Sequence, residues 1–364
     1  MIRAKNRLGI AIIAPSLRKI IGGQEVQADL LLRGWVHDVD VTAHFVPTNE
    51  PLPLGILERI RYCRTVCRFP RYLFLLWRTL SKADIAHIFS AASWSFVIAT
   101  LPAYTLSRLL RKRIIIHYHS PWGEVHLRSS VCARMVLQHA DLVVVPSSYY
   151  VEVFRRFSIV AHCIPNIVDA ALCPYRHRKP LRPFLLSSRN LEPYCGVDNV
   201  IRAFAEVQQQ IPDARLTIAG TGSQERAIRD LIAELKLRRV RLAGRISRER
   251  MGEIYNEADI LINASRADNM PVSLMEAFVA GLPVVTTNAG GISHFVQHYK
   301  TGLLCDPDDW HALADSIVRL IQTPGLADRL SENAHKQACL YRWDVVRQQW
   351  LNAYHSVLRA SSLV

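Results

Sequence analysis

The sequence predicts an α/β protein built from two doubly wound domains, and three observations support this fold class. The chain has 364 residues, more than one hydrophobic core usually serves, and 50% of them are hydrophobic. Short runs rich in β-branched residues alternate with helical stretches along most of the chain. This alternation stops in PNIVDAALCPYRHRKPLRP, an irregular stretch with four prolines that we interpret as the domain boundary.

The first half contains strand-like runs separated by turn and helix signals. Strands are predicted at GIAIIAPS, VTAHFVP, ADIAHIFS, RIIIHYH and DLVVVPS. Gly22 and Gly23 form a loop after the first strand, and QEVQADLLLRG follows as a helix. The basic start and short apolar run of MIRAKNRLGIAIIAPS also fit a signal peptide. We favour a first strand, because the run is only about seven residues long and continues into the loop and the helix.

The second half repeats the alternation more regularly. Its predicted strands are FLLSSRN, ARLTIAG, VRLAG, ADILINA and PVVTT. Helices are predicted at VDNVIRAFAEVQQQ and at residues 223–235, 248–256 and 273–280, followed by a mostly helical tail. We therefore expect a first domain at residues 1–172, a second at residues 173–345, and a C-terminal helix at residues 346–364 that packs back on the first domain. The two domains are expected to face each other across a cleft.

The composition favours a cytoplasmic protein with a basic first domain. Eight cysteines are scattered without a CxxC pair or zinc spacing, which is typical of reduced thiols. No stretch is long and apolar enough to span a bilayer. Residues 1–170 contain 21 Lys and Arg but 11 Asp and Glu, so +10 of the net charge of +14 lies there. This excess predicts an anionic partner: a lipid surface, a phosphorylated substrate or nucleic acid.

Residues 55–82, GILERIRYCRTVCRFPRYLFLLWRTLSK, combine six arginines with aromatic and aliphatic side chains. Arg61, Arg64 and Arg68 share one helical face. Two interpretations stay open. The segment forms two ordinary surface helices interrupted at Pro70, or it is an interfacial segment that lies on an anionic membrane and would place the protein peripherally on the inner membrane face. RNA could use similar residues, but no nucleic-acid-binding module is recognisable, so we expect no nucleic acid.

The stretch RADNMPVSLMEAF places two acids, Asp268 and Glu276, between two apolar runs. Ser273 and Glu276 fit a capping box, in which each side chain accepts a hydrogen bond from a free backbone amide at the start of a helix. Capping does not account for Asp268 and the residues that follow it. A helix start after a parallel strand also suits a phosphate, and carboxylates beside it suit hydroxyl-rich groups such as ribose.

Other loops are predicted to meet at the same edge of the second sheet. Arg189 ends FLLSSRN, Gly220 and Gly222 follow ARLTIAG, and Gly290 and Gly291 follow PVVTTNA. Turns need glycine in any case, so each glycine pair alone is weak evidence for a ligand. Their placement after successive strands favours a nucleotide site, in which Arg189 pairs with a diphosphate.

The second half resembles the family 4 retaining glycosyltransferases, which have the GT-B fold. The resemblance rests on RNLEPYCGVDNVIRAFAEV, PDARLTIAGTGSQ, RLAGRISRERMGEIYNEADILINAS, DNMPVSLMEAFVAGLPVVTTNAGGISHFV and TGLLCDPDD. The first half matches more loosely, through Gly22-Gly23, the HYHS motif that contains His119, and IPNIVD.

The resemblance implies transfer of a hexose from a UDP- or GDP-linked donor, with retention of anomeric configuration. The family's acidic pair falls on Asp268 and Glu276. Glu276 would hold the ribose hydroxyls, and Asp268 with the backbone of Asn269, Met270 and Pro271 would face the donor sugar. The resemblance also implies that Arg189 stabilises the departing diphosphate and that Gly23, beside Gly22, lets the backbone approach the phosphates. It implies that His119 lines the sugar pocket. Gly220 and Gly222 are assigned to the nucleotide site by their placement after a strand.

This sequence departs from the family pattern at two positions. Residue 268 is Asp where Glu is usual, and Cys195 stands where a lysine often precedes the glycine. One cation for the diphosphate is therefore either absent or supplied from elsewhere, with Arg18, Lys19 and Arg266 as candidates. No metal site is expected, because Asp38-Val39-Asp40 and Asp306-Pro307-Asp308-Asp309 look like turns; the leaving diphosphate would be stabilised by a helix N-terminus and Arg189.

We therefore predict a metal-independent glycosyltransferase of polysaccharide biosynthesis, acting on a glycan or lipid-linked acceptor. Two alternatives stay open: a nucleotide-sugar epimerase or phosphorylase of similar build, and a non-catalytic nucleotide-sugar-binding protein of a glycan assembly complex. A hydrolase is disfavoured, because its two carboxylates must flank the scissile bond at a controlled separation.

Overall fold

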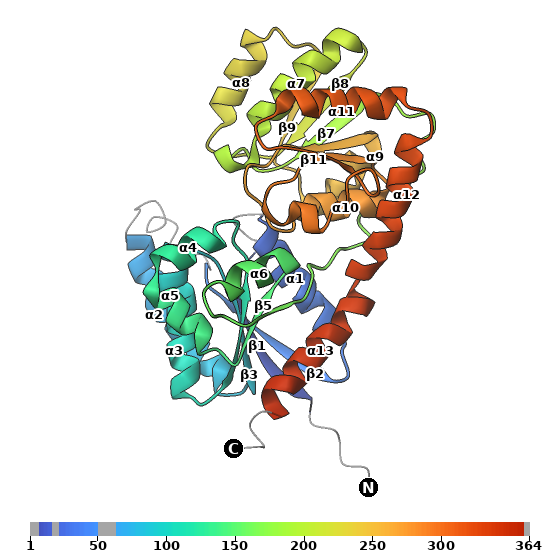
Figure 1. Cartoon of the computed structure of the whole chain (residues 1–364). Helices are drawn as coiled ribbons and strands as arrows, with labels where there is room; N and C mark the ends of the chain where they lie inside the picture. Colours follow the sequence, from blue (N-terminus) through green and yellow to red (C-terminus); the bar gives the residue numbers. More distant parts are fainter. Residues whose placement is uncertain (1–6, 17–21, 50–62, 360–364) are drawn as a thin grey trace. The chain divides into compact units, whose positions relative to one another are not determined.

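The computed structural model describes residues 7–16, 22–49 and 63–359, with the side chains of residues 63–67 left out. Two compact units make up the chain (Figure 1). The first comprises the described residues up to Ile167 and from Val346 onward, and the second comprises residues 168–345. The division after Ile167 lies five residues before the boundary expected after Leu172.

Each unit is built on one parallel six-stranded sheet, which confirms the predicted α/β fold class. The first sheet has the order β2-β1-β3-β4-β5-β6. Its strands are β1 (Leu8–Ala14), β2 (Val41–Pro47), β3 (Ile85–Ser90), β4 (Arg113–Tyr118), β5 (Leu142–Val145) and β6 (Ala161–Cys163). The second sheet has the order β12-β11-β10-β7-β8-β9. Its strands are β7 (Phe184–Ser188), β8 (Arg215–Ala219), β9 (Val240–Gly244), β10 (Ile260–Asn263), β11 (Val284–Thr287) and β12 (Leu303–Cys305).

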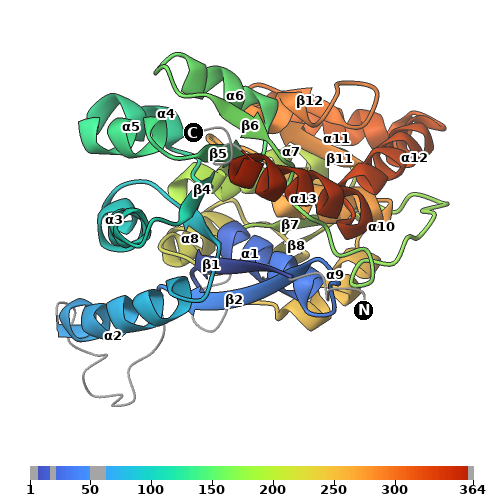
Figure 2. The ribbon, with the colours of Figure 1, turned by 90° about the horizontal axis from the view of Figure 1, so that it is seen from below.

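Helices cover both faces of the first sheet (Figure 2). They are α1 (Gly23–Trp35), α2 (Cys63–Leu80), α3 (Leu101–Leu109), α4 (Gly123–Ser129), α5 (Val131–Gln138), α6 (Ser148–Arg155) and the C-terminal helix α13 (Trp343–Arg359). Alternate strand residues such as Ala11 and Ile13 face the core shared with α2, α3, α5 and α6. The opposite face of the sheet packs against α1 and α13 (Figure 2).

The second sheet is covered in the same way. Its helices are α7 (Val197–Gln210), α8 (Glu225–Glu234), α9 (Met251–Glu257), α10 (Val272–Ala280), α11 (Trp310–Gln322) and α12 (Leu326–Ala338). One core lies under α7, α8 and α11, and the other lies under α9, α10 and α12. The central strands are buried on both faces, which accounts for the continuous apolar runs in the sequence.

The structure of α2 shows that the first interpretation of residues 55–82, two helices interrupted at Pro70, is wrong for the described residues. The helix continues through Pro70 without a break, so the described part of this segment is not two helices. Tyr72, Leu76 and Leu80 bury one face of the helix, and this packing outweighs the loss of one backbone hydrogen bond at the proline. Arg61, which was predicted to share a face with Arg64 and Arg68, lies outside the described residues.

The last helix is anchored to the first unit by a buried tryptophan and a charged cluster. Trp350 is 1% exposed, and the Arg347 guanidinium donates to Asp38 Oδ2 at 2.6 Å and to Asp40 Oδ2 at 2.9 Å. Burial opposes ionisation of Asp38, but Arg347 and neighbouring backbone amides outweigh it and lower the pKa of that carboxyl. The Asp38-Val39-Asp40 motif therefore has a structural partner.

Replacing Trp350 by Ala is expected to lower the free energy of unfolding by about 3–5 kcal/mol, because it leaves a large cavity under α13. Urea denaturation of the full chain measures this loss. The exposed Gln348 of the same helix offers a matched control, and Gln348→Ala is expected to change the value by no more than about 0.5 kcal/mol. Equal losses for the two variants would contradict the proposed anchoring.

Candidate functional site

Two charged residues meet where the strand order of the second sheet reverses. Strands β7 and β10 are neighbours at its centre, and the later strands continue on either side of them. Arg189 follows β7 directly, Asp268 lies in the loop after β10, and their side chains form an ion pair that is 15% and 14% exposed. Ligands of doubly wound sheets bind at this edge, so the pair lies where a ligand is expected.

The ion pair keeps Arg189 charged inside the protein. Burial opposes that charge, but Asp268 outweighs burial, and the pKa of Arg189 is raised. The Arg189 Nη2 atom also lies 3.7 Å from Cys195 Sγ, and burial raises the pKa of this thiol. The buried Nε atom of Arg189 has no hydrogen-bond partner among the described residues. Arg189 therefore retains a free donor beside its carboxylate partner.

Glycines allow the loops at this edge of the sheet to pack with their backbones in direct contact. A side chain at Gly220 would collide with the backbone carbonyl of Arg189, and one at Gly290 would collide with that of Asp268. Gly222 and Gly291 make equally close approaches, to Leu191 and Asn269. The structure thus gives these glycines a packing role that positions the Arg189 and Asp268 loops.

Helix α10 begins differently from the predicted capping box. Its N-cap residue is Pro271, no side chain caps it, and Ser273 lies inside the helix with its hydroxyl lacking a hydrogen-bond partner in the described part of the chain. Glu276 does not reach back to the helix start, because its Oε2 accepts a hydrogen bond from the Tyr255 hydroxyl at 2.8 Å. The capping-box prediction is wrong, and the first turn of α10 is left without a side-chain acceptor.

Glu276 is a buried carboxylate whose charge is partly stabilised by its neighbours. Burial raises its pKa, while the Tyr255 hydroxyl and the charge of Arg248 act in the opposite direction. Arg248 forms an ion pair with Asp169 at 3.6 Å, and its Nε and Nη2 atoms have no hydrogen-bond partner among the residues that the structure describes. The sequence analysis missed Tyr255 and Arg248, because neither lies in a pattern that singles it out.

The residues between the two acids are also buried. Asn269 is 6% and Met270 is 7% exposed, and the Asn269 backbone N–H donates to Asp268 Oδ1 at 2.8 Å. This bond turns the loop, so that Pro271 leads directly into α10.

The lysine missing at position 195 has no replacement among the described candidates. Arg266 binds Asp198 through two hydrogen bonds of 2.9 and 2.7 Å and Asp308 through one of 2.6 Å. It is therefore engaged on the surface and is a poor candidate for the missing cation. Arg18 and Lys19 lie outside the described residues.

In the first unit, the predicted glycine loop leads into α1. Gly22 is the N-cap residue of this helix and Gly23 is its first residue. The backbone N–H groups of Gly22 and Glu25 donate to the Glu25 carboxylate, whose pKa is raised by burial despite these bonds. The helix start therefore already holds an anion of its own chain.

His119 lies directly after β4 and belongs to a buried group of histidines. Its Nε2 atom is 2.8 Å from His117 Nε2, and His117 Nδ1 is 3.3 Å from His87 Nε2. Only His119 was predicted from the sequence; the other two histidines face it through strand alternation and pairing of β3 with β4.

The acidic residues considered for metal binding have other partners. Asp308 binds Arg266 and Asn199, Asp309 caps α11, and Asp306 accepts a hydrogen bond from Asn288. Among the described residues, no group of three His, Cys, Asp or Glu side chains has an arrangement that could hold a metal ion.

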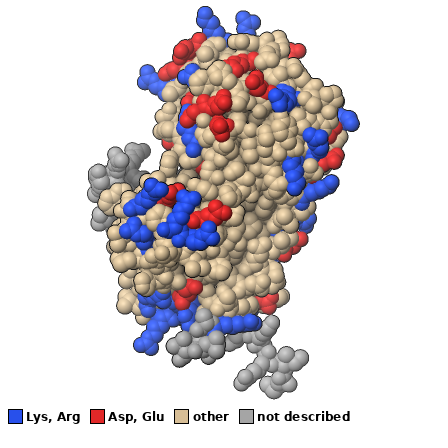
Figure 3. Space-filling model, viewed as in Figure 1, with Lys and Arg blue, Asp and Glu red and all other residues tan. Residues whose placement is uncertain are grey.

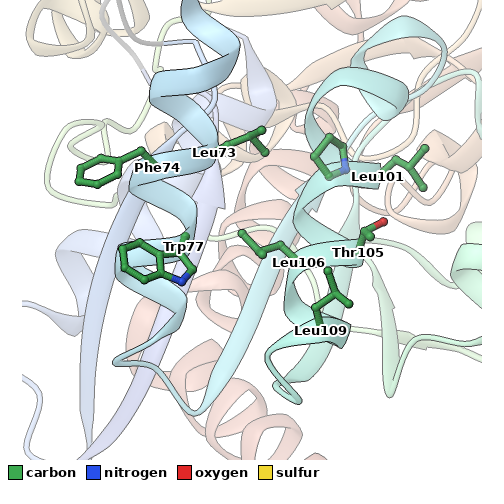
Figure 4. Close-up of a pocket in the computed structure, with 8 residues that line it drawn as sticks. Leu73, Phe74, Trp77, Leu101, Thr105, Leu106 and Leu109 are labelled. Atoms are coloured by element: carbon green, nitrogen blue, oxygen red, sulfur yellow. The ribbon is translucent and has the colours of Figure 1, made fainter.

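An apolar groove of about 630 Å³ lies between α2 and α3 (Figure 4). Its lining residues are Leu73, Phe74, Trp77, Leu101, Pro102, Thr105, Leu106 and Leu109. Phe74 and Trp77 are 55% and 51% exposed. Within the described ranges, no helix is long and apolar enough to cross a membrane. Lys and Arg side chains also gather on the surface over α4–α6 (Figure 3).

Comparison with protein families finds two matches that together cover most of the chain. Residues 176–337 match the family described as glycosyl transferases group 1, and residues 21–172 match glycosyltransferase family 4. Among curated relatives, N-acetyl-alpha-D-glucosaminyl L-malate synthase of Bacillus anthracis is 28% identical over 48% of this chain and 46% of its own length. Glycogen synthase of Mycobacterium tuberculosis is 29% identical over 66% and 61%. The chain thus spans less than two thirds of these relatives.

Solved structures share the fold over nearly the whole chain. Anabaena HepE, solved with UDP and glucose, has a TM-score of 0.74 at 18% identity and covers 96% of this chain and 100% of its own. Sucrose-phosphate synthase from Thermosynechococcus elongatus has a TM-score of 0.77 at 20% identity, with coverage of 97% and 100%.

Tyr255→Phe is expected to raise the pKa of Glu276 further, because the lost hydrogen bond favours the ionised carboxylate. The pH titration of the Glu276 side-chain carboxyl carbon, followed by NMR, would then have its midpoint at a higher pH than in the unmodified protein. Tyr175→Phe, which alters an exposed tyrosine of the same unit, serves as the control. An unchanged midpoint in Tyr255→Phe would show that this hydrogen bond does not set the charge of Glu276.

Proposed function

Because the chain belongs to the family 4 glycosyltransferases, we propose that it moves a hexose from a nucleotide-sugar donor to a glycan or lipid-linked acceptor with retention of anomeric configuration. The observation that carries this proposal is the Arg189–Asp268 pair, which lies beside the uncapped start of α10 at the switch point of the second sheet. A cation, free amides and a carboxylate are thereby gathered at an edge where nucleotides bind.

The donor is proposed to be a UDP- or GDP-linked sugar. UDP is the first choice, since similar solved structures contain UDP or UDP-glucose. Glu276 would accept hydrogen bonds from the ribose hydroxyls, because a buried carboxylate held by one tyrosine hydroxyl still has acceptor capacity. The diphosphate would lie at the amides of Val272 and Ser273 at the start of α10, with the Ser273 hydroxyl as a further donor.

Catalysis is proposed to rest on charge stabilisation. When the bond between sugar and phosphate breaks, negative charge grows on the departing diphosphate and positive charge grows on the sugar. Arg189 and the amides of α10 would stabilise the first, and Asp268 the second. His119 would bind a sugar hydroxyl. No metal ion has a step in this scheme, and we propose that transfer is metal-independent.

One observation favours a second candidate function. Cys195 replaces a cation of the family pattern, and Arg266 is already held by Asp198 and Asp308. A diphosphate would then meet fewer cations than is usual in the family. This favours a non-catalytic nucleotide-sugar-binding protein of a glycan assembly complex, which would bind a donor but turn over no acceptor.

The acceptor is proposed to be lipid-linked, with its chain in the groove between α2 and α3. The groove is lined almost entirely by apolar side chains, and the exposed Arg71, Arg78 and Arg111 lie on α2 and at the end of α3. An apolar groove with arginines on the same helices fits an anionic lipid surface at the cytoplasmic face of a membrane.

Thermal unfolding with UDP-, GDP-, ADP- and CMP-sugars tests the donor site. A donor at 100 times its dissociation constant should stabilise the protein by about 2.7 kcal/mol, and EDTA should not remove the shift. Glu276→Ala should abolish the shift, whereas Glu234→Gln, which changes an exposed carboxylate on α8, should retain it. No shift with any donor, or a full shift in Glu276→Ala, would overturn the assigned site.

Co-sedimentation with vesicles tests the groove. The protein should bind vesicles that contain phosphatidylglycerol at about 0.15 M salt and bind phosphatidylcholine vesicles less. The double variant Phe74→Ser/Trp77→Ser should bind at least about tenfold more weakly, because two aromatic side chains no longer enter the lipid. Val131→Ser/Met135→Ser removes exposed apolar side chains from α5 and should bind normally. Absence of binding, or equal losses in both double variants, would refute a membrane role for this groove.

A further inference from the structure

Three histidines and a tyrosine form a continuous chain of hydrogen bonds inside the first unit. His119 Nε2 is 2.8 Å from His117 Nε2, His117 Nδ1 is 3.3 Å from His87 Nε2, and His87 Nδ1 is 2.9 Å from the Tyr354 hydroxyl. Tyr354 belongs to α13, so the chain links the last helix to the end of β4. His87, His117 and Tyr354 are each less than 5% exposed.

Aromatic side chains enclose this chain. Phe89 stacks on His87 and on His119, with ring centroids 5.1 and 5.3 Å apart. Trp350 lies against His87 and His117 at 4.5 and 4.9 Å. The buried ring nitrogens therefore have one another as partners. His119 Nδ1 alone has no hydrogen bond to any residue in the described ranges.

Burial favours the neutral form of the three imidazoles in the chain. Burial lowers the pKa of His87 and of His119 to about 3, and it also lowers that of His117. A neutral imidazole has one N–H donor and one bare acceptor nitrogen. Each contact in the chain must therefore join a donor to an acceptor, and the direction of the hydrogen bond at one end fixes the direction of all the others.

The Tyr354 hydroxyl sets this direction. It is buried, and its hydrogen-bond partner among the described residues is His87 Nδ1. A buried hydroxyl proton needs an acceptor, so the tyrosine donates to His87 Nδ1. His87 then donates from Nε2 to His117 Nδ1, and His117 donates from Nε2 to His119 Nε2. The proton of His119 is thereby confined to Nδ1.

We propose that Tyr354, His87 and His117 are positioning residues that hold His119 in the Nδ1–H tautomer, so that it offers a hydrogen-bond donor to an oxygen of the bound sugar. The sugar as ligand rests on the proposed function. The tautomer itself is a property of the free protein and can be tested without a ligand.

Long-range ¹H–¹⁵N correlation spectra of the ¹⁵N-histidine-labelled full chain at neutral pH measure the tautomer of each ring. Spectra of His119→Asn and His117→Asn assign the signals. His119 is expected with its proton on Nδ1 in at least about tenfold excess, because the other tautomer sets two N–H groups face to face. A predominant Nε2–H form of His119 would overturn the proposal.

One variant tests the origin of the order. Tyr354→Phe removes the donor to His87. In this variant, the excess of the His119 Nδ1–H form should fall at least about threefold. Tyr72→Phe is the matched control, because it removes another buried hydroxyl of the same unit, one that donates to the Ala99 carbonyl, and it should leave the ratio unchanged. An unchanged ratio in Tyr354→Phe would refute the role of Tyr354.

Binding of UDP-glucose and of UDP to the same variants separates the two proposals. Tyr354→Phe should weaken the binding of UDP-glucose several-fold more than the binding of UDP, since the proposed contact of His119 is with the sugar alone. An equal effect on both ligands, beside the expected tautomer change, would refute the contact with sugar. Absence of binding by either ligand to the unmodified protein would refute a UDP-linked donor and leave the tautomer result standing.

Discussion

The close approach of four loops at the carboxyl edge of the second sheet is the constraint on which the candidate site depends. The loops after β7, β8, β10 and β11 touch at backbone distance, and Gly220 and Gly290 make this possible, since any side chain there would strike the carbonyl of Arg189 or Asp268. Because both carbonyls belong to the charged residues themselves, the glycines fix where these two side chains start. Through this packing, the two glycines determine the geometry of the candidate site.

The Arg189–Asp268 pair that results has consequences for binding. Two buried charges lose their hydration, so each must find its partner or a ligand. Asp268 already satisfies Arg189 in part, and Cys195 adds no second cation. A diphosphate arriving at α10 would therefore compete with Asp268 for Arg189. The shorter side chain of Asp at position 268 places its carboxylate against the guanidinium, and this competition links the two departures from the family pattern.

The sequence was sufficient for the fold and for the positions of Arg189 and Asp268 at the edge of the second sheet. The longer strands carry enough β-branched residues to be found, whereas β6 and β12 have three residues each and offer no period to detect. The capping box failed because the N-cap residue of α10 is Pro271, two positions before Ser273, so that Ser273 lies inside the helix. Glu276 then bonded to Tyr255, 21 positions away, a partner that no local pattern could indicate.

The histidine chain shows why a single site residue found in a sequence is only part of a site. His119 could be singled out by its motif, but the position of its proton depends on Tyr354, which lies more than two hundred positions further along the chain. Strand alternation brings His117 and His119 to one face, parallel pairing brings His87 beside them, and α13 closes the chain. Only the folded first unit joins these contacts in series. A C-terminal helix that packs through Trp350 and Arg347 therefore does more than cover a sheet: it supplies the hydroxyl that orders the protons of three buried rings.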